Sequence, residues 1–126
     1  MDSILLVEDD EMLVRLYKTA LEREQFAVEI ALDGPSGVEK ALAGHPALIL
    51  LDLTLPQLDG LSVMKRIRQD TWGATAPIII LTNSDTSDEI LNAVVEEKPA
   101  YYFIKANTTP EGIILKIKET LNKQIA

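Results

Sequence analysis

Two short apolar segments of this chain each end abruptly in carboxylates. Residues 4–7 are followed by Glu8 and Asp9, and residues 47–51 are followed by Asp52. A short, continuous apolar segment is typical of a strand that is buried on both faces of a parallel sheet. In open parallel sheets the ligand site lies just beyond the carboxyl ends of the strands. We therefore expect Glu8, Asp9 and Asp52 to form one concentrated negative site, which favours a hard dication.

Strand and helix signals alternate along the chain. The segments that predict strands are 3–8, 27–31, 47–52, 78–82 and 101–105. Helices are expected at 11–25, 35–44 and 60–69, and from about 86 and 109 onward. Five such units predict a doubly wound α/β fold with a five-stranded parallel sheet. Right-handed crossovers favour the flavodoxin-like strand order 2-1-3-4-5, and Glu29 places its strand at an edge.

Local signals mark several helix starts. Either Asp9 or Asp10 is suited to cap the first helix, and the Thr86-x-x-Glu89 pattern resembles a capping box for the fourth. In the first helix, the residues at helical spacing that we expect to face the sheet are Leu13, Leu16, Ala20 and Leu21.

The composition excludes several kinds of site and partner. The chain has 126 residues, 47% of them hydrophobic, enough for a single domain (1–126) with an ordinary core. It has no cysteine, so a disulfide or a thiolate metal site is excluded. A net charge of −8 and the lack of a basic helix-turn-helix-like segment argue against direct nucleic acid binding. With no apolar stretch of bilayer length and no basic segment before the first apolar one, we expect a cytoplasmic protein without a membrane anchor.

The expected strand order brings the polar strand ends together. Its switch point lies between the first and third strands, so Glu8, Asp9 and Asp52 should share one crevice. The ends of the fourth and fifth strands bring Thr82 and Lys105 to its rim. Mg²⁺ would relieve the repulsion among the carboxylates, and a carboxylate is a competent nucleophile toward phosphorus. These residues predict a site that accepts a phosphoryl group, and no Gly-rich loop is present to hold a nucleotide.

With these residues the chain closely resembles the receiver domain of two-component response regulators. The resemblance covers essentially the whole chain and rests on Val7-Glu8-Asp9-Asp10, Leu51-Asp52-Leu53, Leu55-Pro56, Asp59-Gly60, Leu81-Thr82 and Lys105. It implies a Mg²⁺-dependent phosphorelay in which Asp52 accepts a phosphoryl group from a phosphohistidine. The implied donor is a sensor histidine kinase or a histidine phosphotransfer protein, and phosphorylation would switch a partner-binding surface.

The resemblance assigns four residues to the metal. Asp9 corresponds to the direct metal ligand of the family, and Glu8 to a ligand that often acts through water. Asp52 itself and the backbone carbonyl of Thr54, two residues later, complete the implied Mg²⁺ ligands.

Other residues correspond to phosphoryl contacts and to the switch. Thr82 and Lys105 correspond to the hydroxyl and the ammonium that contact the phosphoryl oxygens. Thr82 also corresponds to a switch residue, together with the aromatic Tyr102. The chain departs from the family pattern nearby, because Ala106 replaces a proline and Asn83 replaces a small residue. We expect Asn83 to crowd or gate the acceptor.

Two other functions fit parts of this pattern. A pseudo-receiver would keep the fold as an interaction module without being phosphorylated, and Ala106 and Asn83 are the departures that favour it. Phosphatases of the haloacid dehalogenase type also use a strand-end aspartate, but Thr54 stands where those enzymes carry their general acid. We expect a phosphoacceptor and not an enzyme, as a monomer or a weak phosphorylation-dependent dimer. The sequence leaves open whether it acts alone or within a larger regulator.

Overall fold

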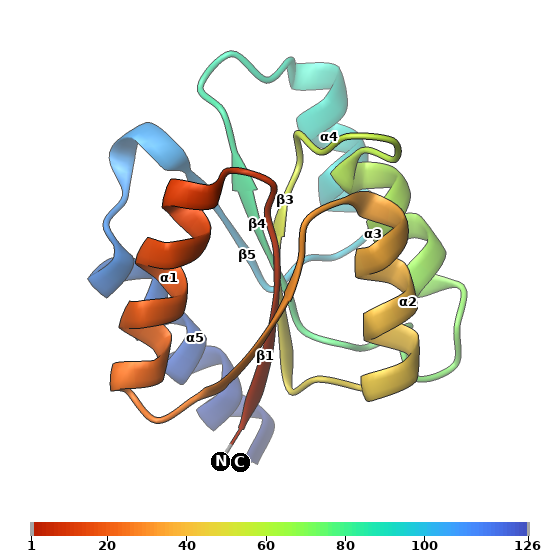
Figure 1. Ribbon diagram of the computed structural model, residues 1–126. Helices are drawn as coiled ribbons and strands as arrows, with labels where there is room; N and C mark the ends of the chain where they lie inside the picture. The colour runs from red at the N-terminus through yellow and green to blue at the C-terminus, as the bar shows by residue number, and fades with distance from the viewer. Residues whose placement is uncertain (1, 126) are drawn as a thin grey trace.

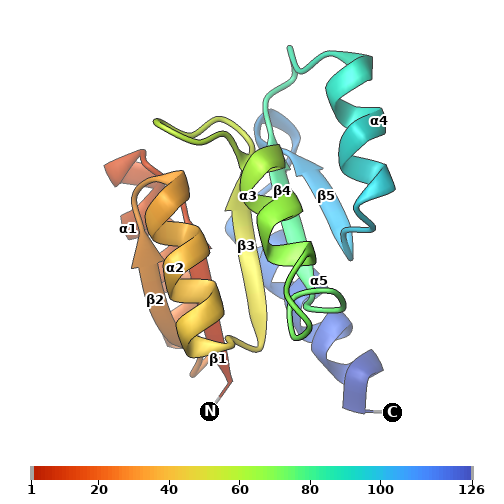
Figure 2. The same cartoon turned by 90° about the vertical axis from the view of Figure 1, so that its right-hand side faces the viewer.

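One parallel sheet of five strands organises the chain, and the computed structural model describes residues 2–125, with side chains up to residue 122. The predicted strand order is confirmed, since the order is β2-β1-β3-β4-β5 (Figures 1 and 2). The strands are β1 (Ser3–Val7), β2 (Ala27–Ala31), β3 (Leu48–Asp52), β4 (Ile78–Thr82) and β5 (Tyr101–Ile104). The helices are α1 (Glu11–Arg23), α2 (Gly34–Gly44), α3 (Gly60–Arg68), α4 (Asp88–Glu96), the short 3-10 helix η1 (Lys105–Asn107) and α5 (Pro110–Ile125).

The central strands are buried and the edge strands are partly exposed. In β1, β3 and β4 every residue is buried except Ser3. In β2 only Ala31 is buried, and Glu29 is exposed, which confirms the predicted edge position of this strand. The other edge strand, β5, exposes Tyr101 and Tyr102. Strands that are apolar on both faces need cover on both faces, and only central strands receive it.

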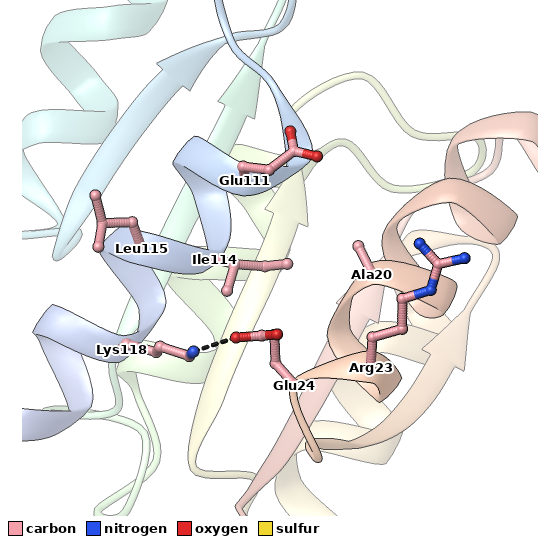
Figure 3. A pocket seen from close by; sticks show the side chains of 7 residues that line it. All are labelled: Ala20, Arg23, Glu24, Glu111, Ile114, Leu115 and Lys118. Carbon is pink, nitrogen blue, oxygen red and sulfur yellow. Dashed lines mark hydrogen bonds and ion pairs between the residues drawn. The ribbon is translucent and has the colours of Figure 1, made fainter.

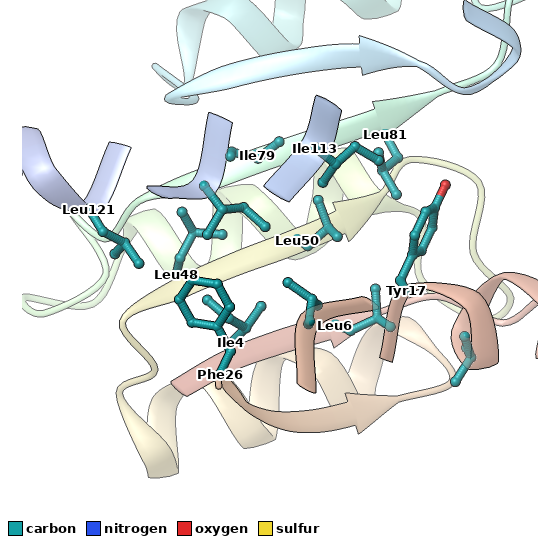
Figure 4. Close-up of a cluster of buried hydrophobic side chains, with 13 residues drawn as sticks. Ile4, Leu6, Tyr17, Phe26, Leu48, Leu50, Ile79, Leu81, Ile113 and Leu121 are labelled. Atoms are coloured by element: carbon teal, nitrogen blue, oxygen red, sulfur yellow. The ribbon is translucent and has the colours of Figure 1, made fainter. Parts of the chain in front are cut away.

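Helices cover both faces of the sheet and make two apolar cores. In Figure 1, α1 and α5 lie on one side of the sheet and α2 and α3 on the other. Along β1, Ile4 and Leu6 point into the α1–α5 core, whereas Leu5 and Val7 point into the opposite core. Figure 4 shows the first core, where each fully buried leucine or isoleucine contributes about 1.5–3 kcal/mol. Within residues 2–125, none of the helices is both long and apolar enough to cross a lipid bilayer.

The buried face of α1 differs from the predicted one. Its buried residues are Val14, Tyr17 and Leu21, whereas Leu16 is 49% exposed. The prediction that Leu16 faces the sheet is therefore wrong. It used only the leucine and alanine residues of this helix and left out Tyr17, which is buried. The ring of Tyr17 packs into the α1–α5 core (Figure 4) together with Leu21, which was predicted correctly. Leu13 is partly buried against the same core, so the prediction fails at Leu16.

Side-chain caps fix the starts of α1 and α4. Asp10, and not Asp9, accepts hydrogen bonds from the first-turn N–H groups of α1. The predicted capping box at α4 is wrong, since Ser87 is the N-cap and accepts the N–H of the third residue after it at 3.2 Å. Thr86 lies outside the helix and its hydroxyl has a different partner, which lies in β4.

Candidate functional site

Within residues 2–122, three polar side chains are buried, namely Glu8, Asp52 and Thr82, with exposures of 0%, 1% and 1%. Each stands at the carboxyl end of a strand: Glu8 directly after β1, Asp52 at the end of β3 and Thr82 at the end of β4. Parallel pairing sets Asp52 opposite Leu81, so the polar residues meet at the same edge of the sheet. Because buried polar groups are costly unless they are paired or bind a ligand, this edge is the candidate site.

The three predicted carboxylates come together. One ligand oxygen from each of Glu8, Asp9 and Asp52 lies within 4.8 Å of the others. The turn after β1 holds Glu8, whose Oε2 accepts the N–H of Asp9 at 3.1 Å and that of Asp10 at 3.2 Å. Asp9 is exposed while the other two carboxylates are buried, so the cluster opens to solvent beside Asp9. Two like charges about 4 Å apart repel by roughly 4 kcal/mol at an effective dielectric near 20.

Lys105 supplies the counter-charge. Its Nζ lies 3.0 Å from Glu8 Oε1 and 3.2 Å from Asp52 Oδ1. Burial alone would lower the pKa of this ammonium, but the charges of Asp52 and Glu8 outweigh burial and raise the pKa above its usual value. Lys105 begins η1 and does not close β5 as predicted. It reaches both carboxylates although Ala106 follows it where the family usually has proline.

One ammonium does not balance three carboxylates. Burial, and then the charge of Asp52, raise the pKa of Glu8 from 4.5 to about 7 in spite of Lys105. Glu8 Oε1 is buried, and among the described residues its partner is the ammonium of Lys105 in an ion pair. The backbone carbonyl of Thr54 accepts no hydrogen bond within residues 2–125. Mg²⁺ in proteins binds carboxylate and carbonyl oxygens, and this cluster offers both together with an excess of negative charge. These residues therefore fit a hard dication.

The chain after β3 fixes Asp52 in place. The N–H of Thr54 donates to Asp52 Oδ1 at 3.1 Å, the same oxygen that faces Lys105. Among the described residues no hydrogen bond to Oδ2 is formed, so this oxygen is the one available to react. Gly60 packs directly behind the strand end, where an added Cβ would lie 2.4 Å from the Asp52 carbonyl oxygen. A side chain at this position would therefore displace the acceptor.

The loop after β4 faces the loop after β3. Asn83 Nδ2 donates to Thr54 Oγ1 at 3.2 Å, so Asn83 lies at the rim where the sequence predicted it to crowd or gate the acceptor. The hydroxyl of Thr82 lies 2.6 Å from that of Thr86. Sequence reasoning missed Thr86 as a site residue, because its spacing from Glu89 predicted a helix cap instead.

Tyr102 is not brought into the carboxylate cluster. It is 43% exposed on the edge strand, opposite Ile80 of β4. Its ring lies beside that of Tyr101, with centroids 6.4 Å apart, and Lys116 of α5 lies 4.3 Å over the Tyr101 ring. The switch role of Tyr102 therefore stays a prediction.

A separate groove lies between α1 and α5. It has a volume of about 320 Å³ and is lined by Ala20, Arg23, Glu24, Glu111, Ile114, Leu115 and Lys118 (Figure 3). Lys118 pairs with Glu24 across it. None of the lining residues belongs to the predicted site, so the groove takes no part in the acceptor chemistry.

The chain is similar to known response regulators in sequence. Residues 4–118 match the family model described as the response regulator receiver domain. The response regulator ArlR of Staphylococcus saprophyticus is 40% identical over 125 residues, which are 98% of this chain and 54% of that protein. ArlR of Staphylococcus epidermidis is 37% identical over the same shares of both chains. The chain thus spans about half the length of the curated relatives it matches.

Solved structures show the same likeness. A CheY-like receiver domain protein from Methanospirillum hungatei superposes with a TM-score of 0.90 at 27% identity, over 98% of this chain and 96% of that one. The receiver domain of a sensor histidine kinase from Pseudomonas aeruginosa has a TM-score of 0.86 at 26% identity, over 96% and 98% of the two chains. That second structure holds a magnesium ion in its active-site cleft.

Proposed function

This chain belongs to the response regulator receiver domain family, and we propose that it accepts a phosphoryl group on Asp52 from a phosphohistidine, with Mg²⁺ bound beside the acceptor. The observation that carries the proposal is the cluster of Glu8, Asp9 and Asp52, whose oxygens lie within 4.8 Å of one another. Lys105 neutralises this cluster only in part, through ion pairs to two of the three carboxylates. Buried charge that lacks full compensation destabilises a fold, so its presence favours a ligand.

The residues around Asp52 are suited to phosphoryl transfer. An oxygen of Asp52 attacks phosphorus, and the new P–O bond forms as the P–N bond to the donor imidazole breaks. The imidazole leaves with the electron pair of that bond and takes up a proton from water. Lys105 is placed to neutralise an oxygen of the transferred group, because it already faces Asp52 at 3.2 Å. The hydroxyl of Thr82 can donate to another of these oxygens once it is released from its present partners.

Glu8, Asp9, Asp52 and the carbonyl of Thr54 are the groups that would hold Mg²⁺. The buried Oε1 of Glu8, which faces Lys105 alone, and the free carbonyl of Thr54 support this assignment among the described residues. When bound, the metal supplies positive charge that neutralises the oxygens of the transferring group. The magnesium ion in the related receiver domain from Pseudomonas aeruginosa is further support.

We assign the donor to a sensor histidine kinase or a histidine phosphotransfer protein, acting in the cytoplasm where ATP supplies the phosphoryl group. Hydrolysis of the acyl phosphate by water would return the Asp52 carboxylate and free phosphate. The chain is then a phosphoacceptor that resets itself and not an enzyme for free substrates. Its output passes through a protein partner or through further chain of a larger regulator, and the charge of −8 makes the receiver itself unsuited to nucleic acid.

Acetyl phosphate with Mg²⁺, followed by intact mass spectrometry, tests the proposal. The wild-type protein should gain the mass of one phosphoryl group, and Asp52→Asn should gain none. A pseudo-receiver predicts no gain in either protein. An enzyme of the haloacid dehalogenase type predicts instead that free phosphate esters are turned over catalytically.

A further inference from the structure

The hydroxyl of Thr82 is held by the loop that follows β4. Its Oγ1 lies 2.6 Å from Thr86 Oγ1 and 3.3 Å from the carbonyl oxygen of Asn83. Thr82 is only 1% exposed, so water does not compete for these contacts. A hydroxyl carries a single proton. Thr82 donates this proton either to the Thr86 hydroxyl or to the carbonyl oxygen of Asn83, and both acceptors belong to this loop. While it is used there, Thr82 has no proton to offer to a group on Asp52.

Thr86 is free to hold Thr82 because another residue caps α4. Ser87 Oγ accepts the N–H of Ile90 at 3.2 Å, which satisfies the first turn of the helix. The backbone N–H of Thr86 donates to the carbonyl of Asn83 at 3.2 Å, so Thr86 is fixed in a tight turn. Its hydroxyl, half-buried beside β4, therefore points back to the strand end.

We infer that Thr86 is a positioning residue: it accepts the Thr82 proton across the 2.6 Å contact and holds this hydroxyl away from the acceptor. Phosphorylation then has to break this hydroxyl pair. The inference rests on the proposed phosphorylation of Asp52. It goes beyond it, because it assigns the resting-state partner of Thr82. Breaking the pair also releases the turn that leads into α4, since Thr86 stands two residues before that helix begins. Thr86 and the phosphoryl group compete for the Thr82 proton. This competition should weaken the affinity for a phosphoryl group by the free energy of one hydrogen bond, roughly two- to tenfold.

Beryllium fluoride with Mg²⁺ is the probe, because it mimics an acyl phosphate without turnover, and its affinity is followed by NMR titration. Thr86→Val keeps the shape of the side chain and removes the hydroxyl, so it should bind beryllium fluoride roughly two- to tenfold more tightly than the wild type. Thr86→Ser keeps the hydroxyl and is the matched control, with an affinity close to that of the wild type. In Thr86→Val the methyl carbon shift of Thr82 in the free protein should also report rotamer averaging. Thr86→Ala removes the same hydroxyl with less bulk and replaces Thr86→Val if that variant does not fold.

The same substitution in a Thr82→Val background separates this role from a general change in packing. Without the Thr82 hydroxyl there is nothing to release, so Thr86→Val should no longer alter the affinity. The inference is overturned if Thr86→Val binds like the wild type, or if its gain persists in the Thr82→Val background. Wild-type protein that binds no beryllium fluoride would instead refute the proposed function, and with it the premise of the inference.

Discussion

Glu8→Gln should make the metal-free protein more stable at alkaline pH, although it removes a proposed metal ligand. Burial, and then the charge of Asp52, raise the pKa of Glu8 from 4.5 to about 7. Between these values the folded protein keeps the proton on Glu8, whereas the unfolded chain releases it. The stability that Glu8 contributes is therefore complete below pH 4.5 and is lost as the pH rises through about 7. The difference of about 2.5 pKa units (7 − 4.5) corresponds to ~3 kcal/mol.

Urea unfolding in the presence of EDTA, at a series of pH values across this range, measures the effect. Glutamine has nearly the same size as glutamate and carries no charge, so titrating groups that do not interact with Glu8 cancel when the two proteins are compared. The wild type should lose ~3 kcal/mol relative to Glu8→Gln as the pH rises from 4.5 to well above 7. Excess Mg²⁺ should restore the wild type and have a smaller effect on the variant. A difference between the two proteins that stays constant over this pH range would refute the reasoning.

Three further substitutions test separate parts of the site. Asn83→Ala removes the amide that donates to Thr54. Time courses of intact mass should show modification by acetyl phosphate up to roughly fivefold faster, and an unchanged rate would contradict gating of the acceptor by Asn83. Lys105→Met removes the cation that competes with Mg²⁺ for the carboxylates, so calorimetry should show tighter Mg²⁺ binding. Mass spectrometry should show slower phosphorylation of the same variant. Weaker Mg²⁺ binding would speak against the assigned ligands. Gly60→Ala places a Cβ 2.4 Å from the Asp52 carbonyl oxygen, and urea unfolding should show a loss of about 1–3 kcal/mol, whereas no loss would show that the loop can move aside.

The sheet and the carboxylate cluster could be predicted because both depend on local patterns. A strand buried on both faces has to be apolar until it leaves the core, so the first polar residue marks its end, as Glu8 and Asp52 do. Strand order then follows from a few topological rules, and the order decides which ends meet. The positions of these acids, and of Lys105 beside them, therefore follow from the sequence.

Other features depend on contacts between segments that no local pattern specifies. The spacing of Thr86 and Glu89 suits a capping box, but Ser87 offers an equally good cap one residue later. The choice between them is set by the partner of Thr86 in β4, which lies outside the helix pattern. The exposure of Leu16 in α1 was missed in the same way, because the ring of Tyr17 is buried on this helix and a pattern of aliphatic residues does not include a tyrosine.

Chemical identification of the modified residue tests the central claim most directly. Borohydride reduces an acyl phosphate to an alcohol, which converts a phosphorylated aspartate to homoserine and can be located by peptide mass spectrometry. After treatment with acetyl phosphate and Mg²⁺, homoserine should appear at position 52 alone, and chelation of the metal with EDTA should abolish it. Homoserine at another position, or equal conversion without the metal, would contradict an acceptor built from Asp52 within a Mg²⁺-binding cluster.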